Sequence, residues 1–362
     1  MKPQRPIPPR RPSEGDGRPV LVTGGAGFIG SNLADRLAGL GHQVIVFDAL
    51  TRPGVESNLD WLRRRHGSRI QPVVADLRDR EQLDRAVDRA GAVFHMAAQV
   101  AVTTSLADPE GDFDVNLRGT LHVLEAARRQ DRPPAVIFAS TNKVYGNLGD
   151  VRLARDGDAY LPEDPGLRAS GIGEDRPLSF YTPYGCSKGA ADQYVLDYAR
   201  GYGVPACVLR MSCIYGPRQL GTEDQGWLAH FLYCVRAGRP ISIYGDGRQV
   251  RDVLYVDDAV DAYLAAWAHI GRVSGQAFNL GGGPANAVTL LQVLGRITEL
   301  TGRTPDLRFA DWRPGDQRYF VADTTRAGQA LGLQRPLPWR EGLARLADWI
   351  ETEHQGLETA AQ

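Results

Sequence analysis

Short runs of apolar residues alternate with longer amphipathic stretches along the first two hundred residues of the chain. The apolar runs predict strands at six places: Pro19–Val22, Gln43–Phe47, Ile70–Val74, Ala92–His95, Val136–Ala139 and Ala206–Leu209. Apolar residues at helical spacing between them predict helices over residues 31–40, 80–90, 116–129 and 190–202. Strands that alternate with helices in this way are typical of an α/β fold with a doubly wound, parallel sheet.

The pattern becomes irregular from about Asn147 to Arg176, where Gly, Asp and Pro are frequent. A stretch this long without a recognisable element usually has a function, so we interpret it as a substrate-side loop of a first domain over residues 19–210. Gly and Pro are dense again in the C-terminal third, which indicates a smaller, discontinuous α/β substrate domain over residues 211–355, with some segments returning to the first domain. Apolar residues at helical spacing predict an amphipathic core helix over Trp339–Glu353.

Composition restricts the class of protein. The 362 residues are 43% hydrophobic and 23% charged with a formal net charge of −1, so a large core is possible and no general attraction to polyanions is expected. We therefore expect no nucleic-acid partner. The four cysteines show neither metal-ligand spacing nor the density of a disulfide scaffold, which indicates reduced thiols in the cytoplasm and no structural metal.

The first eighteen residues are rich in Pro and Arg and contain no apolar run. This composition indicates a disordered tail rather than a secretory signal. No stretch of the chain has the length and apolar character of a membrane span, so no membrane partner is expected either.

A glycine-rich loop, Thr23–Gly30, directly follows the first predicted strand and precedes the first amphipathic helix. Gly24 permits a tight turn, Gly27 allows the backbone to approach a pyrophosphate, and Gly30 lets the helix pack closely on the strand. The unpaired N–H groups at the start of the helix favour a phosphate. Glycines also punctuate ordinary loops, but this order of strand, loop, helix and strand favours dinucleotide binding.

The second strand ends at Asp48, at about the distance from the glycine loop where a carboxylate accepts hydrogen bonds from an adenosine ribose. A 2′-phosphate in place of the ribose hydroxyl would meet like charge at Asp48, so this residue favours NAD over NADP. Arg52 lies close enough in sequence to weaken that preference. NAD is the predicted cofactor.

Tyr184 and Lys188 are four residues apart, so a helix that includes both presents their side chains on one face. A phenol is a poor base at neutral pH because its pKa is near 10, but a nearby ammonium and a cationic nicotinamide ring favour the phenolate. Thr141 follows a predicted strand and can hold the same substrate oxygen. Tyr and Lys at this spacing often occur by chance; together with Thr141 and the glycine loop they indicate hydride transfer with NAD.

These residues and several further motifs resemble the extended short-chain dehydrogenase/reductases, a Rossmann-fold family that acts mainly on nucleotide sugars. The resemblance extends from Val20 to about Ile350 and includes the runs His95–Ala98, Ser140–Gly146, Ile214–Arg218 and Arg251–Asp258. It implies that Thr141, Tyr184 and Lys188 are catalytic. It also implies NAD-binding roles for Gly24, Gly27, Phe28, Ile29, Asp48, Asp76, Leu77, Ala97, Ala98 and Lys188.

The two residues after Thr141 distinguish members of this family. Its sugar 4,6-dehydratases place Asp-Glu there, as acid and base for the elimination of water, whereas this chain has Asn142 and Lys143. Elimination of water is therefore not expected. The chain instead resembles the CDP-sugar 2-epimerases that convert CDP-paratose to CDP-tyvelose, in the runs Ser140–Gly146, Thr182–Tyr194, Ser212–Gln219 and Asp224–Trp227.

That resemblance implies an isomerase that inverts C2 of a CDP-linked deoxyhexose with no net redox change. Tyr184, aided by Thr141 and Lys188, would remove the proton of the C2 hydroxyl while the C2 hydride passes to NAD. The 2-ketosugar would then turn, and return of the hydride to its opposite face would invert the centre. Such a site has to hold cofactor and nucleotide firmly while the hexose rotates.

Six residues are candidates for contacts with the nucleotide sugar: Asn142, Lys143, Arg218, Gln219, Arg251 and Arg313. Guanidinium groups match pyrophosphate oxygens in fork geometry, which favours the three arginines as the anchor. Each arginine has the alternative of being a solvated surface charge. Asn142 and Lys143 have the alternative of supporting the loop after the strand.

Other polar residues have structural interpretations. His95 lies at a strand end and is interpreted as a packing and hydrogen-bonding residue, since Tyr184 and Lys188 already provide an acid and base. Asp257 and Asp258 resemble a pair of catalytic carboxylates, but neighbours on a strand point to opposite faces. They are interpreted as caps of the following helix.

Three functions stay open from the sequence. The first is the 2-epimerase, the second a related NAD enzyme acting at C4 of a UDP-linked or other nucleotide-linked sugar, and the third a non-catalytic NAD-binding sensor. A sensor predicts decay of the catalytic set, which is complete here. The family resemblance also implies a homo-oligomer, a dimer or tetramer, built through the helices over residues 113–129 and 190–202.

Overall fold

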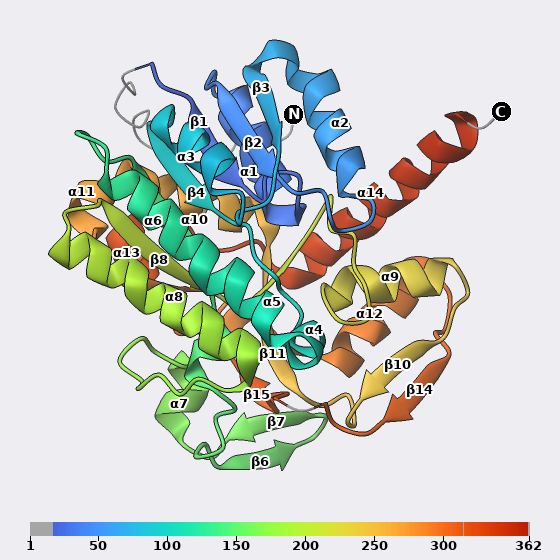
Figure 1. Cartoon of the computed structure of the whole chain (residues 1–362). Helices are drawn as coiled ribbons and strands as arrows, with labels where there is room; N and C mark the ends of the chain where they lie inside the picture. The colour runs from blue at the N-terminus through green and yellow to red at the C-terminus, as the bar shows by residue number, and fades with distance from the viewer. Residues whose placement is uncertain (1–16, 314, 361–362) are drawn as a thin grey trace.

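The computed structural model of the chain describes residues 17–313 and 315–360 and contains a seven-stranded parallel sheet (Figure 1). The strands lie in the order β12-β8-β5-β4-β1-β2-β3. Their bounds are β1 Val20–Thr23, β2 Val44–Asp48, β3 Ile70–Val74, β4 Ala92–His95, β5 Ala135–Thr141, β8 Ala206–Met211 and β12 Ala277–Leu280. The strand order reverses between β1 and β4, and ligands of such folds bind beyond the carboxyl ends of the strands at this point. The predicted Rossmann-type fold is confirmed, and β12 is a strand that was not predicted.

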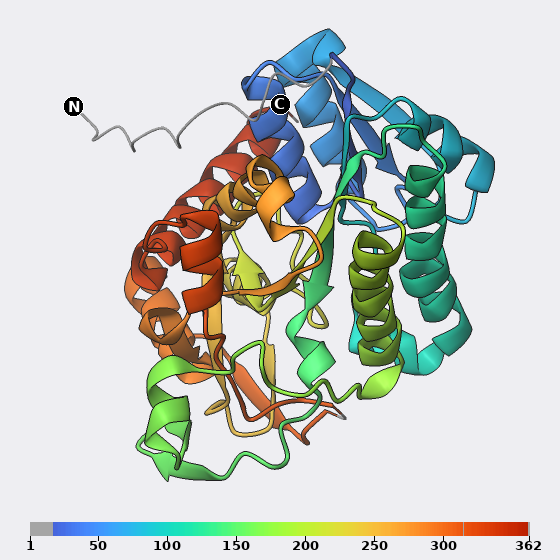
Figure 2. The same ribbon diagram turned by 90° about the vertical axis from the view of Figure 1, so that its left-hand side faces the viewer.

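Helices cover both faces of this sheet (Figure 2). One face packs against α1 Phe28–Gly39, α2 Val55–His66, α10 Val256–Ala268, α11 Ile270–Val273 and α13 Thr325–Leu331. The other face packs against α3 Arg80–Asp88, α6 Gly119–Arg128 and α8 Thr182–Gly201. Val20 and Val22 belong to the first core and Leu21 to the second, because successive side chains of a strand point to opposite faces.

Between β4 and α6 the chain forms α4 Val102–Ala107, α5 Pro109–Phe113 and one π-helical turn, Asp114–Arg118. The helix predicted over residues 116–129 therefore begins as α6 only at Gly119. All three segments before α6 pack against α8. This packing brings residues 102–118 beside the turn of α8 that carries Tyr184 and Lys188.

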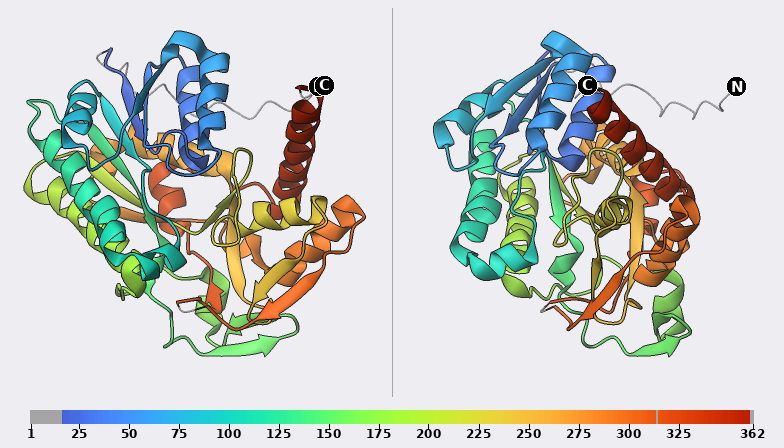
Figure 3. Two further views of the ribbon diagram at one scale, coloured as in Figure 1. Left: turned by 45° about the vertical axis from the view of Figure 1, so that its right-hand side comes forward. Right: turned by 90° about the vertical axis from the view of Figure 1, so that its right-hand side faces the viewer.

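The remaining elements form a second region that faces the carboxyl ends of the large sheet (Figure 3). Its mixed sheet is centred on β11 Val250–Tyr255, with β9 Cys213–Tyr215, β13 Ala287–Thr289 and β15 Tyr319–Phe320, and β10 Ile241–Tyr244 pairs with β14 Leu307–Ala310. The helices α9 Trp227–Arg236, α12 Leu290–Thr301 and α14 Trp339–Ala360 share its core. The predicted C-terminal helix is α14, with Leu343, Leu346 and Ile350 buried as its amphipathic pattern indicates. Short 3₁₀ turns lie at Gly67–Arg69, Asn142–Tyr145 and Pro284–Asn286.

The interpretation of residues 147–176 as an irregular loop was wrong. The segment contains the hairpin of β6 Leu153–Asp156 and β7 Ala159–Pro162, followed by α7 Pro165–Ser170. The hairpin is held on the second region, because the Tyr160 N–H donates to Arg248 O at 3.2 Å and its hydroxyl donates to Asp246 Oδ2 at 2.7 Å. Strands of four residues in a Gly- and Asp-rich stretch are too short for their alternation to be recognised.

The interpretation of Asp257 and Asp258 as helix caps was also wrong. Tyr255 is the N-cap of α10, so both carboxylates lie inside its first turn, where negative charge suits the positive end of the helix dipole. Asp258 Oδ2 accepts the backbone N–H of Leu337 at 2.8 Å. The two residues therefore serve the fold.

Residues 1–16 of the predicted disordered tail lie outside the described residues. Within the described part of the chain, no helix combines the length and the apolar character that a membrane span requires.

Candidate active site

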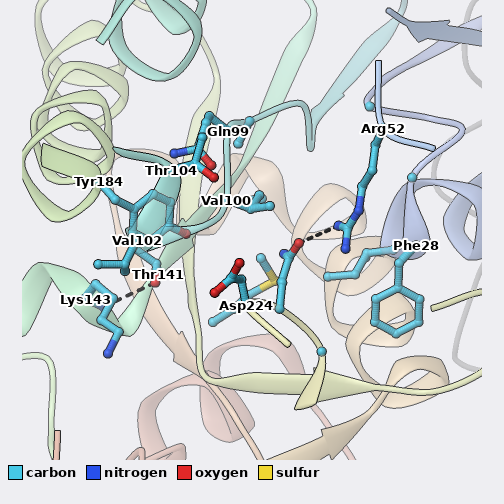
Figure 4. Close-up of a pocket in the computed structure, with 18 of the residues that line it drawn as sticks. Phe28, Arg52, Gln99, Val100, Val102, Thr104, Thr141, Lys143, Tyr184 and Asp224 are labelled. Carbon is cyan, nitrogen blue, oxygen red and sulfur yellow. Dashed lines mark hydrogen bonds between the residues drawn. The ribbon is translucent and has the colours of Figure 1, made fainter. Parts of the chain in front are cut away.

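A cavity of about 830 Å³ runs along the carboxyl ends of the large sheet and continues between the two regions (Figure 4). The glycine loop and the end of β2 line one part of it, Thr141 and Tyr184 line the middle, and residues of the second region line the rest. The cavity thus joins most of the residues that the sequence assigned to cofactor, catalysis and substrate.

The glycine loop leaves no room for side chains. Gly24 has φ +66°, and a Cβ on it would lie 2.7 Å from the backbone nitrogen of Ala97. A Cβ on Gly30 would lie 2.1 Å from the carbonyl oxygen of Gly24. No side chain caps the N-terminus of α1, whose N-cap is Gly27. The loop is therefore a cradle of backbone groups at a helix N-terminus, which fits a pyrophosphate.

Asp48 is fixed at the end of β2 by two backbone donors. Its Oδ2 accepts the N–H of Ala26 and its Oδ1 accepts the N–H of Leu50, both at 2.9 Å. The carboxylate lines the cavity, as its predicted contact with a ribose requires. Arg52, the residue that weakened the preference for NAD, donates to Gln225 Oε1 and to Leu220 O instead. Its guanidinium is thus already engaged with the second region, which fits NAD better than NADP.

The other predicted cofactor residues surround the same part of the cavity. Those that line it are Phe28, Ile29, Asp76, Leu77, Ala97 and Ala98. Asp76 accepts Arg78 Nε at 2.9 Å and Nη2 at 2.8 Å, and this pairing lowers the pKa of the carboxyl group. The donor set of this part of the cavity, a backbone cradle with one fixed carboxylate and apolar walls, suits a dinucleotide.

Thr141 ends β5 and Tyr184 lies in the first turn of α8, and both side chains project into the cavity (Figure 4). Burial raises the pKa of Tyr184 to about 12, although a hydrogen bond with Thr141 acts to lower it. The sequence argument expected a nearby ammonium to favour the phenolate. In the protein by itself burial outweighs every other influence on this phenol, so the protein's own groups do not make it a base.

Lys188 lies one turn beyond Tyr184, behind the cavity wall, and is 2% exposed. Its Nζ is 4.1 Å from the centre of the Phe138 ring. Burial lowers the pKa of Lys188 to about 7, while Asp192 and Asp112 act to raise it. The ammonium is therefore poised between its two protonation states near neutral pH.

A buried network that the sequence did not reveal supports this turn of α8. Arg210 donates from Nε and Nη2 to the two oxygens of Asp192, each at 2.9 Å, and Ser140 donates to the same carboxylate at 2.8 Å. Arg210 also donates to the hydroxyl of Tyr145 at 3.1 Å. These bonds join β5, α8 and β8 and fix the strand end that carries Thr141. Asp192 lies in a recognised motif run, but its partner is distant in sequence.

His95 has the structural role that was predicted. It is 1% exposed, and its ring nitrogens lie 2.7 Å from Thr23 Oγ1 and 3.0 Å from Thr120 Oγ1. Burial, with a smaller contribution from Lys188, lowers the pKa of His95 to about 3. The ring is therefore neutral at physiological pH and ties β1 to α6.

Four predicted substrate residues line the cavity: Asn142, Lys143, Gln219 and Arg251. Lys143 Nζ donates to Gly315 O at 3.3 Å, and burial, followed by repulsion from Arg251, lowers its pKa to about 8. Arg251, which is 7% exposed, pairs with Asp316 at 2.7 Å. Asn142 and Gln219 are buried in the cavity wall, and Gln219 Nε2 donates to Ile214 O at 3.1 Å.

Arg313 also lines the cavity. Its Cζ lies 3.6 Å from the centre of the Tyr244 ring, and its guanidinium pairs with Asp224 at 3.1 Å and Glu223 at 3.5 Å. The two carboxylates were not predicted as site residues, although Asp224 belongs to a run singled out in the sequence. Their contacts hold the guanidinium at the cavity wall.

Arg218 does not line the main cavity. Its Cζ lies 4.2 Å from the centre of the Trp61 ring and 5.4 Å from that of Trp349. The residue has φ +70°, which directs the side chain to the helices α2 and α14. We therefore withdraw Arg218 as a pyrophosphate anchor; its flat cation is used for packing between two indoles.

The described residues contain no group of three or more His, Cys, Asp or Glu side chains that could hold a metal ion. Cys213 lines the cavity and burial raises the pKa of its thiol.

The chain belongs to the NAD dependent epimerase/dehydratase family, whose family model matches residues 20–281. Enzymes of this family use NAD, which is accordingly the cofactor of this epimerase.

Individual relatives differ in the reaction that their names give. The chain is 39% identical over 344 residues to the CDP-paratose 2-epimerase of Salmonella typhi, covering 92% of this chain and 99% of that protein. The UDP-glucose 4-epimerase of Thermotoga maritima, solved with UDP-glucose, superposes with a TM-score of 0.78 at 31% identity over 92% of this chain and 99% of that one. The Thermus thermophilus UDP-glucose 4-epimerase, solved with NAD, superposes with a TM-score of 0.76 at 32% identity, over 92% of this chain and 98% of that one.

Proposed function

We propose that this protein inverts C2 of a CDP-linked deoxyhexose, in the manner of the conversion of CDP-paratose to CDP-tyvelose, through a transient 2-ketosugar. The observation that carries the proposal is the pair Asn142 and Lys143 directly beside Thr141 and Tyr184 in one cavity. An amide and an ammonium stand where a dehydratase needs its acid and base, so the site retains the groups for reversible oxidation only. The 39% identity to a CDP-paratose 2-epimerase supports the position and the nucleotide.

Proton transfer at the C2 oxygen is the task of the catalytic residues. NAD, held by the glycine loop and Asp48, would supply the hydride acceptor and donor at the sugar carbon, and its cationic ring would favour the phenolate of Tyr184 that burial disfavours. Tyr184 takes the hydroxyl proton while Thr141 holds the oxygen, and Lys188 supports the phenolate from behind. Tyr184 gives the proton back after the sugar has turned, so no net oxidation occurs.

Arg251, Arg313 and Lys143 form the proposed anchor for the pyrophosphate. Both guanidiniums are paired with carboxylates at the cavity wall, so a phosphate meets cations whose positions are already fixed. Under this proposal residues 19–210 mainly bind NAD and residues 211–355 mainly bind the nucleotide sugar. We also propose that the enzyme is a cytoplasmic homo-oligomer.

Epimerisation at C4 of a UDP-linked sugar is the second candidate. It is favoured by the likeness to the Thermotoga and Thermus UDP-glucose 4-epimerases over 92% of this chain. Both candidates use the same catalytic residues and differ in which carbon the bound sugar presents to the cofactor. A non-catalytic sensor is disfavoured, because Thr141 and Tyr184 meet in the same cavity that the glycine loop lines.

A direct test incubates the purified enzyme with CDP-paratose, CDP-glucose and UDP-glucose in deuterated water without added reductant and analyses the sugars by NMR. Inversion at C2 of a CDP-linked sugar, with no deuterium at that carbon, is expected. Inversion at C4 of UDP-glucose would replace the proposal by the second candidate. Conversion of none of the three would reject both activities for these substrates.

Tyr184→Phe is expected to lower epimerase activity at least about a hundredfold, because it removes the group that exchanges the hydroxyl proton. NAD binding should persist, since Tyr184 is not part of the glycine loop or the ribose contact. Tyr194→Phe is the matched control, because Tyr194 lies on the same helix and is 43% exposed. Turnover of the Tyr184→Phe enzyme close to that of the control would exclude the proposed proton transfer.

A further inference from the structure

Asp112, in α5, is a buried carboxylate whose described hydrogen-bond donors are all neutral. It is 1% exposed. Its Oδ1 accepts Gln99 Nε2 at 2.8 Å and Asn116 Nδ2 at 3.0 Å, and its Oδ2 accepts the hydroxyl of Ser187. Burying a carboxylate is unfavourable without an opposite charge close by, so the negative charge of Asp112 requires a counterion in its neighbourhood.

The other buried carboxylate near Lys188 already has such a counterion. Asp192 receives two hydrogen bonds from the guanidinium of Arg210, which neutralises its charge. Asp112 has no cation among its described hydrogen-bond partners. The two carboxylates therefore differ in whether a cation is bonded to them, although both attract Lys188.

Lys188 is a cation whose charge acts on Asp112. Ser187, which donates to Asp112, directly precedes Lys188 in α8, and α5 packs on that helix. Asp112 and Lys188 attract one another, and Asp112 also acts on Tyr184. The chain thus places a buried carboxyl group with only neutral hydrogen-bond donors where it acts on both members of the Tyr-Lys pair, and burial raises the pKa of this carboxyl group.

Asp108, the N-cap of α5, acts on Asp112 as a like charge. Several other titratable groups on the elements around Lys188 have partners of their own or no charge. His95 on β4 is neutral, Arg210 on β8 is bound to Asp192, and Lys143 donates to Gly315. Farther along the packed helices, Asp114 pairs with Arg118 and Glu125 with Arg128. His122 lies 3.4 Å from Leu77 O, and Tyr145 is bonded to Asn279 and Arg210.

We propose that Asp112 is a positioning residue of the active site, whose carboxylate is the counterion that keeps Lys188 an ammonium beside Tyr184. The inference rests on the proposed roles of Tyr184 and Lys188 and extends them to a residue outside the family motifs. Burial lowers the pKa of Lys188 to about 7, and Asp192 and then Asp112 act against that effect. Removing the charge of Asp112 therefore lowers the pKa of Lys188 further. It also lowers the pKa of Tyr184, because the same charge disfavours the phenolate.

Asp112→Asn removes the charge and keeps the shape. The new amide oxygen can accept from Gln99 and Asn116, and the new amide nitrogen can donate to Ser187, whose hydroxyl is able to reverse its bond. The fold should therefore persist. Ser187→Ala is the matched variant, since it removes one donor from the same network and keeps the carboxyl group of Asp112.

The composition of the chain makes the test unusually direct. Only three of its 42 basic residues are lysines: Lys2, which lies outside the described residues, Lys143 and Lys188. Carbon-13 placed at lysine Cε in the NAD-bound enzyme gives three signals, which Lys2→Arg and Lys143→Arg assign. The pH at which the Lys188 signal reaches its midpoint then measures its protonation without any sugar substrate.

In Asp112→Asn the midpoint of Lys188 is expected to fall by about one pH unit, the effect of losing an opposite charge at close range. Lys143, on which Asp112 has no described influence, should keep its midpoint, as should Lys188 in Ser187→Ala. An unchanged Lys188 midpoint in Asp112→Asn, within about 0.3 units, would overturn the inference. An equal fall of the Lys188 midpoint in Ser187→Ala would also overturn the inference, because the loosened hydrogen-bond network and not the charge of Asp112 would then be responsible.

The pH dependence of turnover, measured on whichever sugar the enzyme converts, gives an independent reading. Both limbs of the pH profile should move to lower pH in Asp112→Asn, because both pKa values fall. A purely structural role would reduce turnover without moving the limbs, and that result would contradict the inference. If no sugar is converted, the proposed function fails, while the lysine titration still decides whether Asp112 is the counterion of Lys188.

Discussion

At the scale of single residues, the direction in which a side chain points matters more than which residue carries it. Arg218, Arg251 and Arg313 were equivalent candidates as anchors, yet only the last two reach the cavity wall. Arg218 instead lies against the indoles of Trp61 and Trp349, which come from two helices far apart in the sequence. A sequence states that a cation is present, but its neighbours in space decide where that cation points.

His95 provides a prediction at this scale. Its pKa in the folded protein is about 3, below the ordinary histidine value of 6.5, so as pH falls from 6.5 only the unfolded chain takes up this proton. The residue therefore lowers the free energy of unfolding by up to about 1.4 kcal/mol for each pH unit below 6.5. His95→Gln can still bond to both threonines. Between pH 7 and pH 5 its free energy of unfolding should fall by about 2 kcal/mol less than that of the wild type.

Urea unfolding at the two pH values measures that difference. His66→Gln is a useful control, because His66 is bound to Asp35 at 2.7 Å rather than isolated in a core. If the free energy of unfolding fell equally in His95→Gln and in the wild type between pH 7 and pH 5, His95 would be protonated in the folded protein at pH 5.

At the scale of elements, the glycine loop and α1 form one unit. Gly30 is the contact between the first turn of the helix and the turn at Gly24, and the atoms that a new Cβ would meet are backbone atoms, which cannot move independently. Gly39, at the other end of the same helix, has no such neighbour within 4 Å. The two glycines share an element and differ only in their surroundings.

Gly30→Ala should therefore weaken NAD binding by at least about tenfold, which corresponds to about 1.4 kcal/mol, and should lower Tm through overpacking. Gly39→Ala should leave NAD binding unchanged and raise stability by up to about 1 kcal/mol, because alanine is the better helix former. Calorimetric titration with NAD and thermal unfolding of both variants test this. Equal NAD affinities would mean that the loop adjusts without cost.

At the scale of the whole molecule, the segment from Pro217 to Gln225 ties the second region to the glycine-loop side of the large sheet. Asn32 Nδ2 donates to Pro217 O at 3.0 Å, Asn58 Nδ2 donates to Arg218 O at 3.4 Å, and Arg52 donates to both Leu220 O and Gln225. The segment therefore crosses from the second region to the glycine-loop side, and Gln219 and residues 223–225 within it line the cavity. An epimerase has to keep its reduced cofactor until the hydride returns, and this crossing suits that need.

Arg52→Ala is expected to release NAD about tenfold faster, because it removes two hydrogen bonds made by a charged group across the cavity. Arg63→Ala is the control, since Arg63 is exposed on α2. Stopped-flow displacement of bound NAD measures both rates. If Arg52→Ala released NAD at the rate of the control, the crossing segment would have no part in retaining the cofactor.

The sequence by itself determined what depends on short stretches of chain. Six strands, the cradle around Gly24, the carboxylate of Asp48 and the Thr141, Tyr184 and Lys188 set were all predictable, because strand alternation, helical spacing and motifs are local. The family, confirmed by comparison, followed from the same motifs.

Only the tertiary structure decided what depends on partners far apart in the chain. It added β12 to the sheet, turned residues 153–162 into a hairpin, paired Asp192 with Arg210 and moved Arg218 out of the cavity. It also placed Asp112 against the turn that carries Lys188. Burial sets the charge of these groups, and burial is a property of the packed molecule that no local pattern contains.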